Sequence, residues 1–423
     1  MLNTILSAFT VAEIRKKLAF TALLLGLYRL GSHIPVPGID TQAVKSLSQF
    51  SGSNILSFLN LFSGGALSKL ALFALGIMPY ITASIILQLL TVVVPSLEKL
   101  SKEGEVGQAR ITQYTRYLTV GLAFAQSIGY VFLFRSLSAS SGVPVITHFD
   151  LPHVFLIVVT LTAGTVLLMW MGELITQRGI GNGISLMIFA SIVSRLPSGL
   201  QAWWTSDNQI FKVMMPFIVL GVVASIVFIQ EGQRRIPVQY AKRVIGRRMT
   251  QGGQTYLPLR VNMAGVIPVI FAASIMAFPP TVGQLINTPW AQSISNFFTP
   301  NGWHYVVGES VFIVLFTYFY TAVTFNPVDQ AENLKKYGGF IPGVRPGRPT
   351  AEFLDRILAR LTFPGALYLA AVAALPTILI ARAHANFFFG GTSVLIVIGV
   401  ALDTMKQLEA QLMMRNYEGF LKT

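Results

Sequence analysis

Residues 70–94, "LALFALGIMPYITASIILQLLTVVV", form an uncharged stretch of 25 positions. An α-helix rises about 1.5 Å per residue, so about 20 apolar residues are enough to cross the hydrocarbon core of a bilayer. This stretch is therefore predicted to span a membrane. Of the 423 residues in the chain, 53% are hydrophobic and 11% are charged, and the mean hydropathy is +0.62. The composition indicates a protein that crosses the bilayer several times.

Apolar runs between charged residues predict ten spans and an all-α fold. Prolines such as Pro79, Pro268 and Pro376 fall inside these runs, where each is expected to kink a helix. Three basic residues, 15–17, precede the first run, which is longer than a signal-peptide core and is expected to be retained. The predicted spans lie near residues 18–36, 70–94, 117–134, 154–174, 182–196, 213–230, 261–280, 306–325, 363–381 and 391–405.

The positive charges predict the orientation of these spans. Lys and Arg total 31. If the N-terminus is cytosolic, 24 of them lie on the cytosolic side and six on the outer side, with Arg29 inside the first span. This asymmetry follows the positive-inside rule, so both termini are predicted to be cytosolic. Each half, 1–200 and 201–423, then holds five spans, and an odd number allows the second half to be inverted relative to the first.

The chain lacks the residue patterns of enzymes and pumps. It has no cysteine, no GxxxxGK[ST] motif and no HExxH motif, so we expect no thiol chemistry, nucleotide site, metal site or cofactor. "RGIGNG", residues 178–183, follows a span and is interpreted as a turn in which Asn182 caps the next helix. Arg29, His33 and Glu309 lie near span ends and are expected to snorkel to an interface. We expect no enzymatic activity.

An unusual segment follows the first span at residues 52–69, "GSNILSFLNLFSGGALSK". It is too short to cross a membrane and too apolar for an ordinary exposed loop. Gly64 and Gly65 are interpreted as a hinge. An interfacial helix on the outer leaflet and a segment that folds back to close a pore both fit this composition.

Isoleucines and polar residues recur within the predicted spans. Pairs such as Ile81 and Ile85, or Ile184 and Ile188, are four residues apart and share one helix face. Taken alone, an isoleucine in a membrane span contacts lipid or packs between helices far more often than it lines a pore, so the spacing by itself does not predict a ring. The polar residues include Thr82, Ser84, Gln88, Gln126 and Asn262. Such side chains hydrogen-bond between helices for about 1 kcal/mol each, which fits either a contact that opens or static packing.

Two predicted cytosolic loops, 231–260 and 326–362, are long and basic. The first contains "RRIPVQYAKRVIGRR", residues 234–248, with six Lys and Arg in fifteen positions. This stretch fits anionic headgroups, nucleic-acid phosphates or a protein partner. The second contains the Gly- and Pro-rich "GGFIPGVRPGRP", residues 338–349, followed by a short amphipathic helix. Long loops on a membrane core without chemistry of its own are typical of docking surfaces.

Several strings resemble the bacterial SecY family, the channel subunits of the protein-conducting translocon. The resemblance runs nearly end to end, with minor departures in the short outer loops and in "GQARIT", where an arginine pair is common. The strings are "ALGIMPYITASIILQLL" (74–90), "TQRGIGNGISLMIFASIV" (176–193), "LPLRVNMAGVIPVIFAASI" (257–275), "FNPVDQAENLKKYGGFIPGVRPG" (325–347) and "FGGTSVLIVIGVALDT" (389–404).

This resemblance implies two inverted five-helix halves around a central pore, with a constriction ring and a plug. An apolar ring would close the pore by excluding water and fitting around a passing chain. The ring is expected at Ile81, Ile85, Ile184, Ile188, Ile267, Ile270 and Ile396. The plug is expected at about residues 54–65, with Asn54, Leu56, Phe58, Leu59, Phe62, Gly64 and Gly65.

The resemblance also implies a lateral gate and docking sites. The gate, formed by spans two, three, seven and eight, would admit signal sequences to lipid, and its polar residues are matched by Thr82, Ser84, Gln126 and Asn262. The basic loops would dock the SecA motor ATPase and the ribosome, partly through phosphates of ribosomal RNA. The docking residues are expected to be Arg234, Arg235, Lys242, Arg243, Arg247, Arg248 and Arg345.

The function implied by the resemblance is that of a passive, gated channel in the bacterial plasma membrane, assembled with SecE and SecG. It would translocate unfolded secretory proteins and release signal sequences and membrane segments of nascent chains sideways into lipid, driven by SecA or the ribosome. Two other classes stay open. An inverted-repeat solute transporter is disfavoured by the scarcity of buried ionisable groups. A docking scaffold without a pore would leave the prolines and the plug-like segment unexplained.

Overall fold

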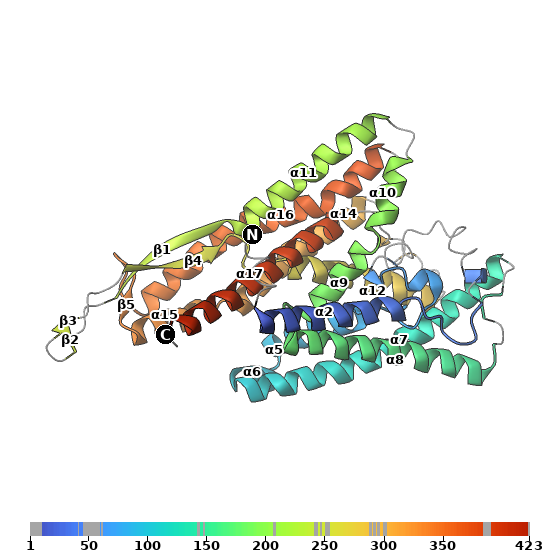
Figure 1. The fold of residues 1–423 in the computed structure, drawn as a ribbon, viewed down its shortest axis with the longest axis horizontal. Coiled ribbons are helices and arrows are strands. Elements are labelled where there is room, and N and C mark those ends of the chain that lie inside the picture. Colours follow the sequence, from blue (N-terminus) through green and yellow to red (C-terminus); the bar gives the residue numbers. More distant parts are fainter. Residues whose placement is uncertain are drawn as a thin grey trace. The chain divides into compact units, whose positions relative to one another are not determined.

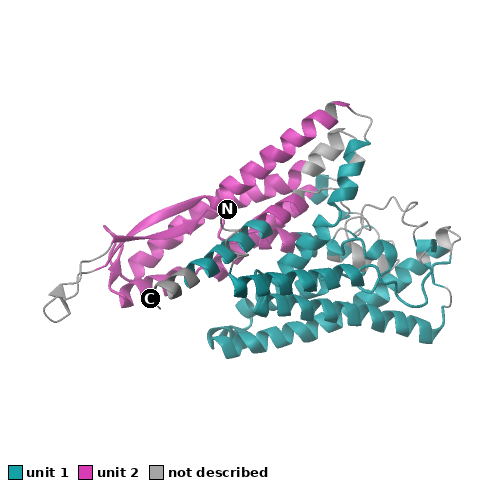
Figure 2. Ribbon diagram, in the orientation of Figure 1, with its two compact units in different colours: residues 1–205, 273–305, 400–423 teal, residues 206–272, 306–399 magenta. Residues whose placement is uncertain are grey.

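The computed structural model is mostly helical (Figure 1). The chain forms two compact units, coloured separately in Figure 2. The first comprises residues 1–205, 273–305 and 400–423, and the second comprises 206–272 and 306–399. The structure describes residues 11–40, 42–44, 60, 62–141, 144–146, 149–205, 209–240, 244–245, 248–249, 254–286, 290, 293, 297–298, 303–383 and 391–421.

The first unit is a helical bundle in which α8 packs against α2, α7 and α9. Glycines allow the closest approaches, because a Cβ atom on Gly183 would lie 2.0 Å from the carbonyl oxygen of Gly172. Its elements are α2 (Ala12–Gly31), η1 (Leu67–Lys69), α5 (Met78–Val93), α6 (Pro95–Lys102), α7 (Glu105–Ser141), α8 (Leu151–Arg178), α9 (Gly183–Val193) and α10 (Leu196–Trp204).

The second unit combines helices with a small sheet. Three of the four boundaries between the two units fall within α12, α14 and α17, and the fourth falls between α10 and α11. The remaining elements are α11 (Gln209–Glu231), β1 (Gln233–Tyr240), β2 (Val244–Ile245), β3 (Arg248–Met249), β4 (Gln254–Arg260), α12 (Ile267–Ile286), α14 (Trp303–Thr324), α15 (Pro327–Lys336), β5 (Gly339–Phe340), α16 (Arg348–Ala383) and α17 (Gly391–Leu421).

The expectation of an all-α fold is wrong in the basic loops, where β1 and β4 of the first loop and β5 of the second form an antiparallel sheet in the order β4-β1-β5. Alternation explains the sheet, because Ile236 and Val238 are buried while Arg235 and Gln239 are exposed. Leu259 lies opposite Arg234 in the register and completes the buried face. That face belongs to a hydrophobic cluster with residues of α16, so the sheet is packed into the second unit.

Six helices among the described residues are long and apolar enough to cross a membrane, by length and composition. The pair α5 and α6 makes a seventh if it is a single span, bent by 100° at Val94. The amphipathic segment and the predicted span 363–381 form one continuous helix, α16, rather than two. The structure therefore supports a mostly helical protein with several spans.

The kinks expected at Pro79 and Pro268 are absent, because each proline is the second residue of its helix, α5 or α12. Proline is favoured there, since its missing N–H would have no partner in the first turn. Gly76 and Gly265, each three residues before its proline, both have φ of 62°. The two units thus share a Gly-x-x-Pro helix start, "GIMP" and "GVIP". Pro376 lies inside α16, as expected.

The "RGIGNG" segment is a turn between α8 and α9, which confirms the interpretation of its glycines and asparagine. The Asn182 side chain accepts hydrogen bonds from the backbone N–H groups of Ile184 and Ser185, at 3.1 and 3.3 Å. This is the expected N-terminal cap of α9. Gly181 has φ of 87°, a conformation that favours glycine.

Candidate functional site

The first unit carries four of the expected ring isoleucines on two helices. Ile81 and Ile85 are buried on α5, with exposed fractions of 4% and 1%. Ile188 is 1% exposed on α9, and Ile184 is half-buried. Each pair lies on one helix face, as its spacing predicts.

The second unit carries the other three on α12 and α17. Ile270 and Ile396 are buried, and Ile267 is half-buried. A Cβ atom on Gly399 would lie 2.0 Å from Val266 Cγ1, so α17 approaches the start of α12 as closely as glycine permits. Ile270 is two residues after Pro268, as Ile81 is two residues after Pro79. The repeated helix start therefore places a buried isoleucine two residues after the proline in both units.

The base of the expected plug is buried in the first unit. Asn54, Leu56, Phe58 and Leu59 lie outside the described residues. Phe62 is 1% exposed, Gly64 is buried and Gly65 is half-buried. Arg29 donates a 3.0 Å hydrogen bond from Nη1 to the Gly64 carbonyl oxygen. Gly64 is therefore fixed rather than a free hinge, and this base does not lie on a surface as an interfacial helix would.

The residues expected in the lateral gate are not joined to one another by hydrogen bonds within the described part of the chain. Thr82 donates to the carbonyl of Met78 in its own helix, at 3.0 Å. Asn262 lies before α12 rather than within a span, and its side chain donates to the carbonyl of Gly265 at 2.9 Å. Ser84 and Gln126 are half-buried.

Polar contacts that the sequence did not reveal lie close to these positions. Ser127, next to Gln126, lies 3.2 Å from Thr162 between hydroxyl oxygens and so joins α7 to α8. Ser274 on α12 donates to the Met78 sulfur of α5 over 3.8 Å. A Ser–Met contact carries no periodic signal that could have indicated it.

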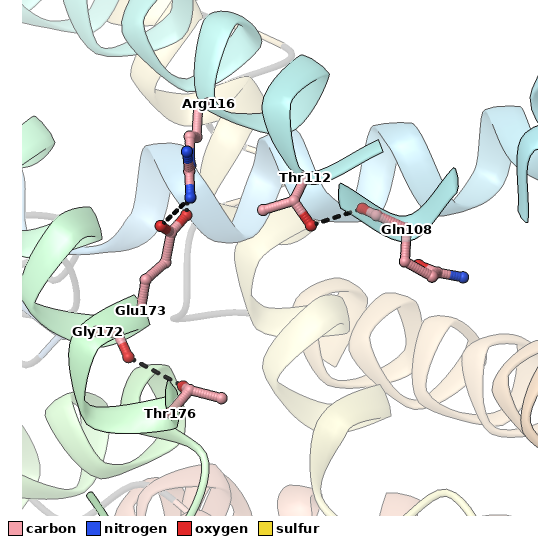
Figure 3. Close-up of polar contacts among 6 residues, drawn as sticks. All are labelled: Gln108, Thr112, Arg116, Gly172, Glu173 and Thr176. Carbon is pink, nitrogen blue, oxygen red and sulfur yellow. Dashed lines mark hydrogen bonds and ion pairs between the residues drawn. The ribbon is translucent and has the colours of Figure 1, made fainter. Parts of the chain in front are cut away.

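An ion pair joins α7 and α8. Arg116 donates from Nε and Nη2 to the two carboxylate oxygens of Glu173, at 2.9 and 2.5 Å (Figure 3). Thr176, one turn after Gly172, accepts a hydrogen bond from the backbone N–H of Gly183 at 2.9 Å. The pair and this contact fix α8 between the helices on either side of it.

Of the expected docking residues, Arg234 and Arg235 lie on β1 of the sheet, and Arg345 lies on the turn before α16. The outward face of the sheet holds Arg235, Pro237, Tyr256 and Pro258, which stand opposite one another in the register. Arg234 is also exposed, although it projects from the other face. Lys242, Arg243 and Arg247 lie outside the described residues, and of Arg248 only the backbone is described, in β3.

Arg345 lies on a well-defined turn with its side chain exposed. Its carbonyl accepts a 2.8 Å hydrogen bond from the Thr350 hydroxyl, and the N–H of Thr350 donates to the carbonyl of Gly347. Gly343 and Gly347 have φ of 82° and 104°. The backbone thus presents the Arg345 guanidinium to solvent in a fixed place.

The three ionisable residues that were expected to snorkel, Arg29, His33 and Glu309, differ in how deeply they are buried. Glu309 is 4% exposed inside the second unit, so the expectation that it snorkels is wrong. Arg29 is half-buried on Gly64, and His33 is exposed. Within the described ranges, no group of three or more His, Asp or Glu side chains could hold a metal ion.

Comparison with known proteins gives the family. Residues 71–405 match the family described as SecY. Curated relatives called protein translocase subunit SecY are 49% identical in Corynebacterium glutamicum, 50% in Streptomyces griseus and 47% in Mycobacterium tuberculosis. In each case the match covers 100% of both chains.

Solved structures share the fold. They include a protein conducting channel, a SecY protein whose plug domain stabilizes the closed state, and Sec61 in the canine ribosome-channel complex, with TM-scores of 0.64, 0.62 and 0.60. Each is 19% identical, and each alignment covers 93% of this chain and 91% of the other. At this identity the likeness establishes the fold alone.

Proposed function

The chain belongs to the SecY family, and we propose that it forms the protein-conducting pore of a bacterial translocon. The observation that carries the proposal is the 49% identity to a curated protein translocase subunit over the full length of both chains. The fold it shares with a solved protein conducting channel agrees with it. The channel moves unfolded secretory proteins across the plasma membrane and releases membrane segments sideways into lipid.

The seven isoleucines form the constriction ring of this pore. Ile81, Ile85, Ile188, Ile270 and Ile396 are all buried, and no charged residue is among the seven. Branched aliphatic side chains exclude water from a narrow pore and yield to a passing chain of any sequence. The repeated Gly-x-x-Pro start supports the assignment, because it places Ile81 in α5 and Ile270 in α12 at the same distance from the start of the helix.

The plug closes this pore from residues 54–65, and α5, α7, α12 and α14 form the lateral gate. Thr82, Ser84, Gln126 and Asn262 remain the proposed polar gate residues, with Ser274 and Met78 as an added contact between α5 and α12. A weak contact suits a gate, because helices that must part cannot be held by strong bonds.

The energy for protein translocation comes from partner proteins that dock on the channel. The sheet and the Arg345 turn form the surface on which SecA or the ribosome docks. Arg234, Arg235 and the basic residues between β1 and β4 would meet ribosomal RNA through phosphates, without reading bases. SecE and SecG complete the complex.

The whole chain crosses the membrane ten times, in two inverted halves of five spans divided near residue 200, with both termini cytosolic. Supporting this count, α2, α12 and α17 are helices at the positions of three further predicted spans. Both the positive-inside asymmetry and the odd number of spans per half favour the inverted arrangement.

Reconstitution tests the proposal against a solute transporter. The complex with SecE and SecG is placed in liposomes, and protease protection of a precursor protein is measured beside the uptake of labelled small solutes. Protection that requires SecA and ATP is the expected result. Solute accumulation without precursor protection would instead identify a transporter.

A further inference from the structure

The base of the plug, residues 60 and 62–65, is flanked by two arginines, one in α2 and one between α9 and α10. Arg29 of α2 donates from Nη1 to the Gly64 carbonyl oxygen at 3.0 Å. Arg195, after α9, places Nη2 3.8 Å from the point where a Cβ atom of Gly65 would lie. Neither guanidinium forms an ion pair with a carboxylate of the described residues.

The chain on the C-terminal side of Gly64 is fixed by its own hydrogen bonds. Gly65 N–H donates to the Asn60 carbonyl at 3.0 Å, and Ser68 N–H donates to the Asn60 side-chain oxygen at 3.1 Å. The Leu67 N–H donates to Ser63 Oγ at 3.2 Å. These bonds tie Asn60 and Ser63 to the residues after Gly64, so the base would move as one piece.

Gly64 is packed among the helices that carry the ring. It has φ of 64°, and a Cβ atom there would lie 2.9 Å from the Tyr28 hydroxyl and 3.2 Å from Ser191 Cα. Ser191 is one turn after Ile188 and lies 2.5 Å from the Tyr28 hydroxyl, measured from its Oγ. On the other side, a Cβ atom on Gly76, just before α5, would lie 3.3 Å from Ser63 Cα.

We propose that Arg29 is the latch that holds the plug base closed. The inference rests on the proposed channel function. The carbonyl of Gly64 is the acceptor, and the guanidinium is a charged donor, which makes the bond stronger than one between neutral groups. If the plug base moves, Arg29 loses this acceptor and is left beside Arg195, so opening exposes two neighbouring cations. A hydrogen bond from a charged donor contributes enough to shift a two-state equilibrium by about tenfold or more.

The test uses the complete complex in liposomes, with Arg29→Met, Arg29→Lys and the matched control Arg195→Met. Arg29→Met removes charge and donor, Arg29→Lys keeps a charged donor, and Arg195→Met removes a charge at the same place without removing a hydrogen bond of the described residues. Two quantities are measured in resting vesicles: the leak of small ions, and the labelling rate of a Ser63→Cys thiol by a membrane-impermeant maleimide. This chain has no natural cysteine, so the thiol is unique within it. Ser63 is 1% exposed, so labelling reports displacement of the base.

Arg29→Met is expected to raise both the leak and the labelling rate about tenfold, with Arg29→Lys in between and Arg195→Met unchanged. SecA-driven precursor transport should persist in all three. Equal values for Arg29→Met and wild type would overturn the latch, as would an equal rise in Arg195→Met, which would make the effect one of charge. If Arg29→Met fails to assemble, the test rests on Arg29→Lys. The latch is then overturned if the leak and labelling rate of Arg29→Lys equal those of wild type or those of Arg195→Met. Loss of precursor transport in wild type would instead contradict the proposed function.

Discussion

Arg345 combines a fixed backbone with an exposed guanidinium, so its side chain is free to bind a partner without supporting the fold. Arg345→Glu is expected to leave complex assembly intact and to lower SecA-driven precursor transport at least about tenfold, because it reverses the charge at the proposed docking contact. Protease protection of the precursor measures the loss. Arg356→Glu, an exposed charge reversal on α16, is the control, and transport at the wild-type rate in Arg345→Glu would remove this residue from the docking site.

Glu309 presents the opposite case, a carboxyl that is 4% exposed in a membrane helix. Burying a charged group costs several kcal/mol unless it is paired. Glu309→Gln cannot ionise and nearly keeps the shape, so at alkaline pH, where the wild-type carboxyl must ionise in its buried site, the variant complex is expected to unfold at a higher temperature than wild type. A thermal unfolding scan in detergent checks this, and a lower midpoint would show that the carboxylate has a stabilising partner.

At the scale of elements, the Arg116–Glu173 pair should contribute to the packing of α7 on α8. Its side chains are 44% and 12% exposed, so we expect a coupling free energy of about 1 kcal/mol rather than the larger value of a buried pair. A double-mutant cycle with Arg116→Met and Glu173→Gln, followed by denaturation in detergent, measures it. The Lys102–Glu98 pair, with side chains 73% and 49% exposed, is the control and should show almost no coupling. Equal coupling in the two pairs would contradict the expectation.

The helix starts at Gly76 and Gly265 make a second prediction at this scale. Both glycines have φ of 62°, where an L-residue with a Cβ atom costs about 1–2 kcal/mol. Gly76→Ala and Gly265→Ala are each expected to lower the unfolding free energy by at least about 1 kcal/mol. Gly26→Ala in α2 is the control, because a Cβ atom there meets nothing within 4 Å. Neutral effects at 76 and 265 would mean that these helix starts tolerate alanine.

Sequence patterns predicted the helices well and their ends poorly. Apolar runs predicted α8, α11 and α14, because a helix that crosses a membrane needs a continuous run of apolar residues, which is visible in the sequence. The start of α5 was placed eight residues early, since residues 70–77 are apolar but form turns. The sheet was missed because β1 was interpreted by its charges, although Ile236 and Val238 alternate with exposed residues.

Contacts between residues far apart in the chain could not be predicted from the sequence, for a different reason. Arg29 donates to a backbone carbonyl 35 positions away, and a carbonyl has no residue type by which it could be recognised. Glu309 was assigned to an interface by its position near a span end, but packing within the second unit decides its burial. The ring and plug residues were predicted from the family resemblance, because the sequence does not distinguish an isoleucine that faces a pore from one that faces lipid.

At the scale of the whole molecule, the distribution of Lys and Arg predicts the orientation. Twenty-four of the 31 Lys and Arg lie on the predicted cytosolic side. Trp204, Trp290 and Trp303, with exposed fractions of 72%, 60% and 69%, fall in segments predicted to lie on the outer side. Exposed tryptophans favour both membrane interfaces, where the ring is apolar and its N–H reaches water, so these three mark the ends of spans rather than the side of the membrane.

Single cysteines test this orientation cleanly, because the natural chain has none. Gln108, at the start of α7, is predicted to be cytosolic, and Gln201, in α10, to be outside; both are exposed. In right-side-out vesicles an impermeant maleimide should label Gln201→Cys directly and Gln108→Cys only after permeabilisation, and inverted vesicles should give the reverse. Because an odd number of the predicted spans, three, separates these two positions, labelling of both from one side would contradict the predicted order of spans in the first half. Exchange of the two results would keep that order and overturn the cytosolic placement of the N-terminus.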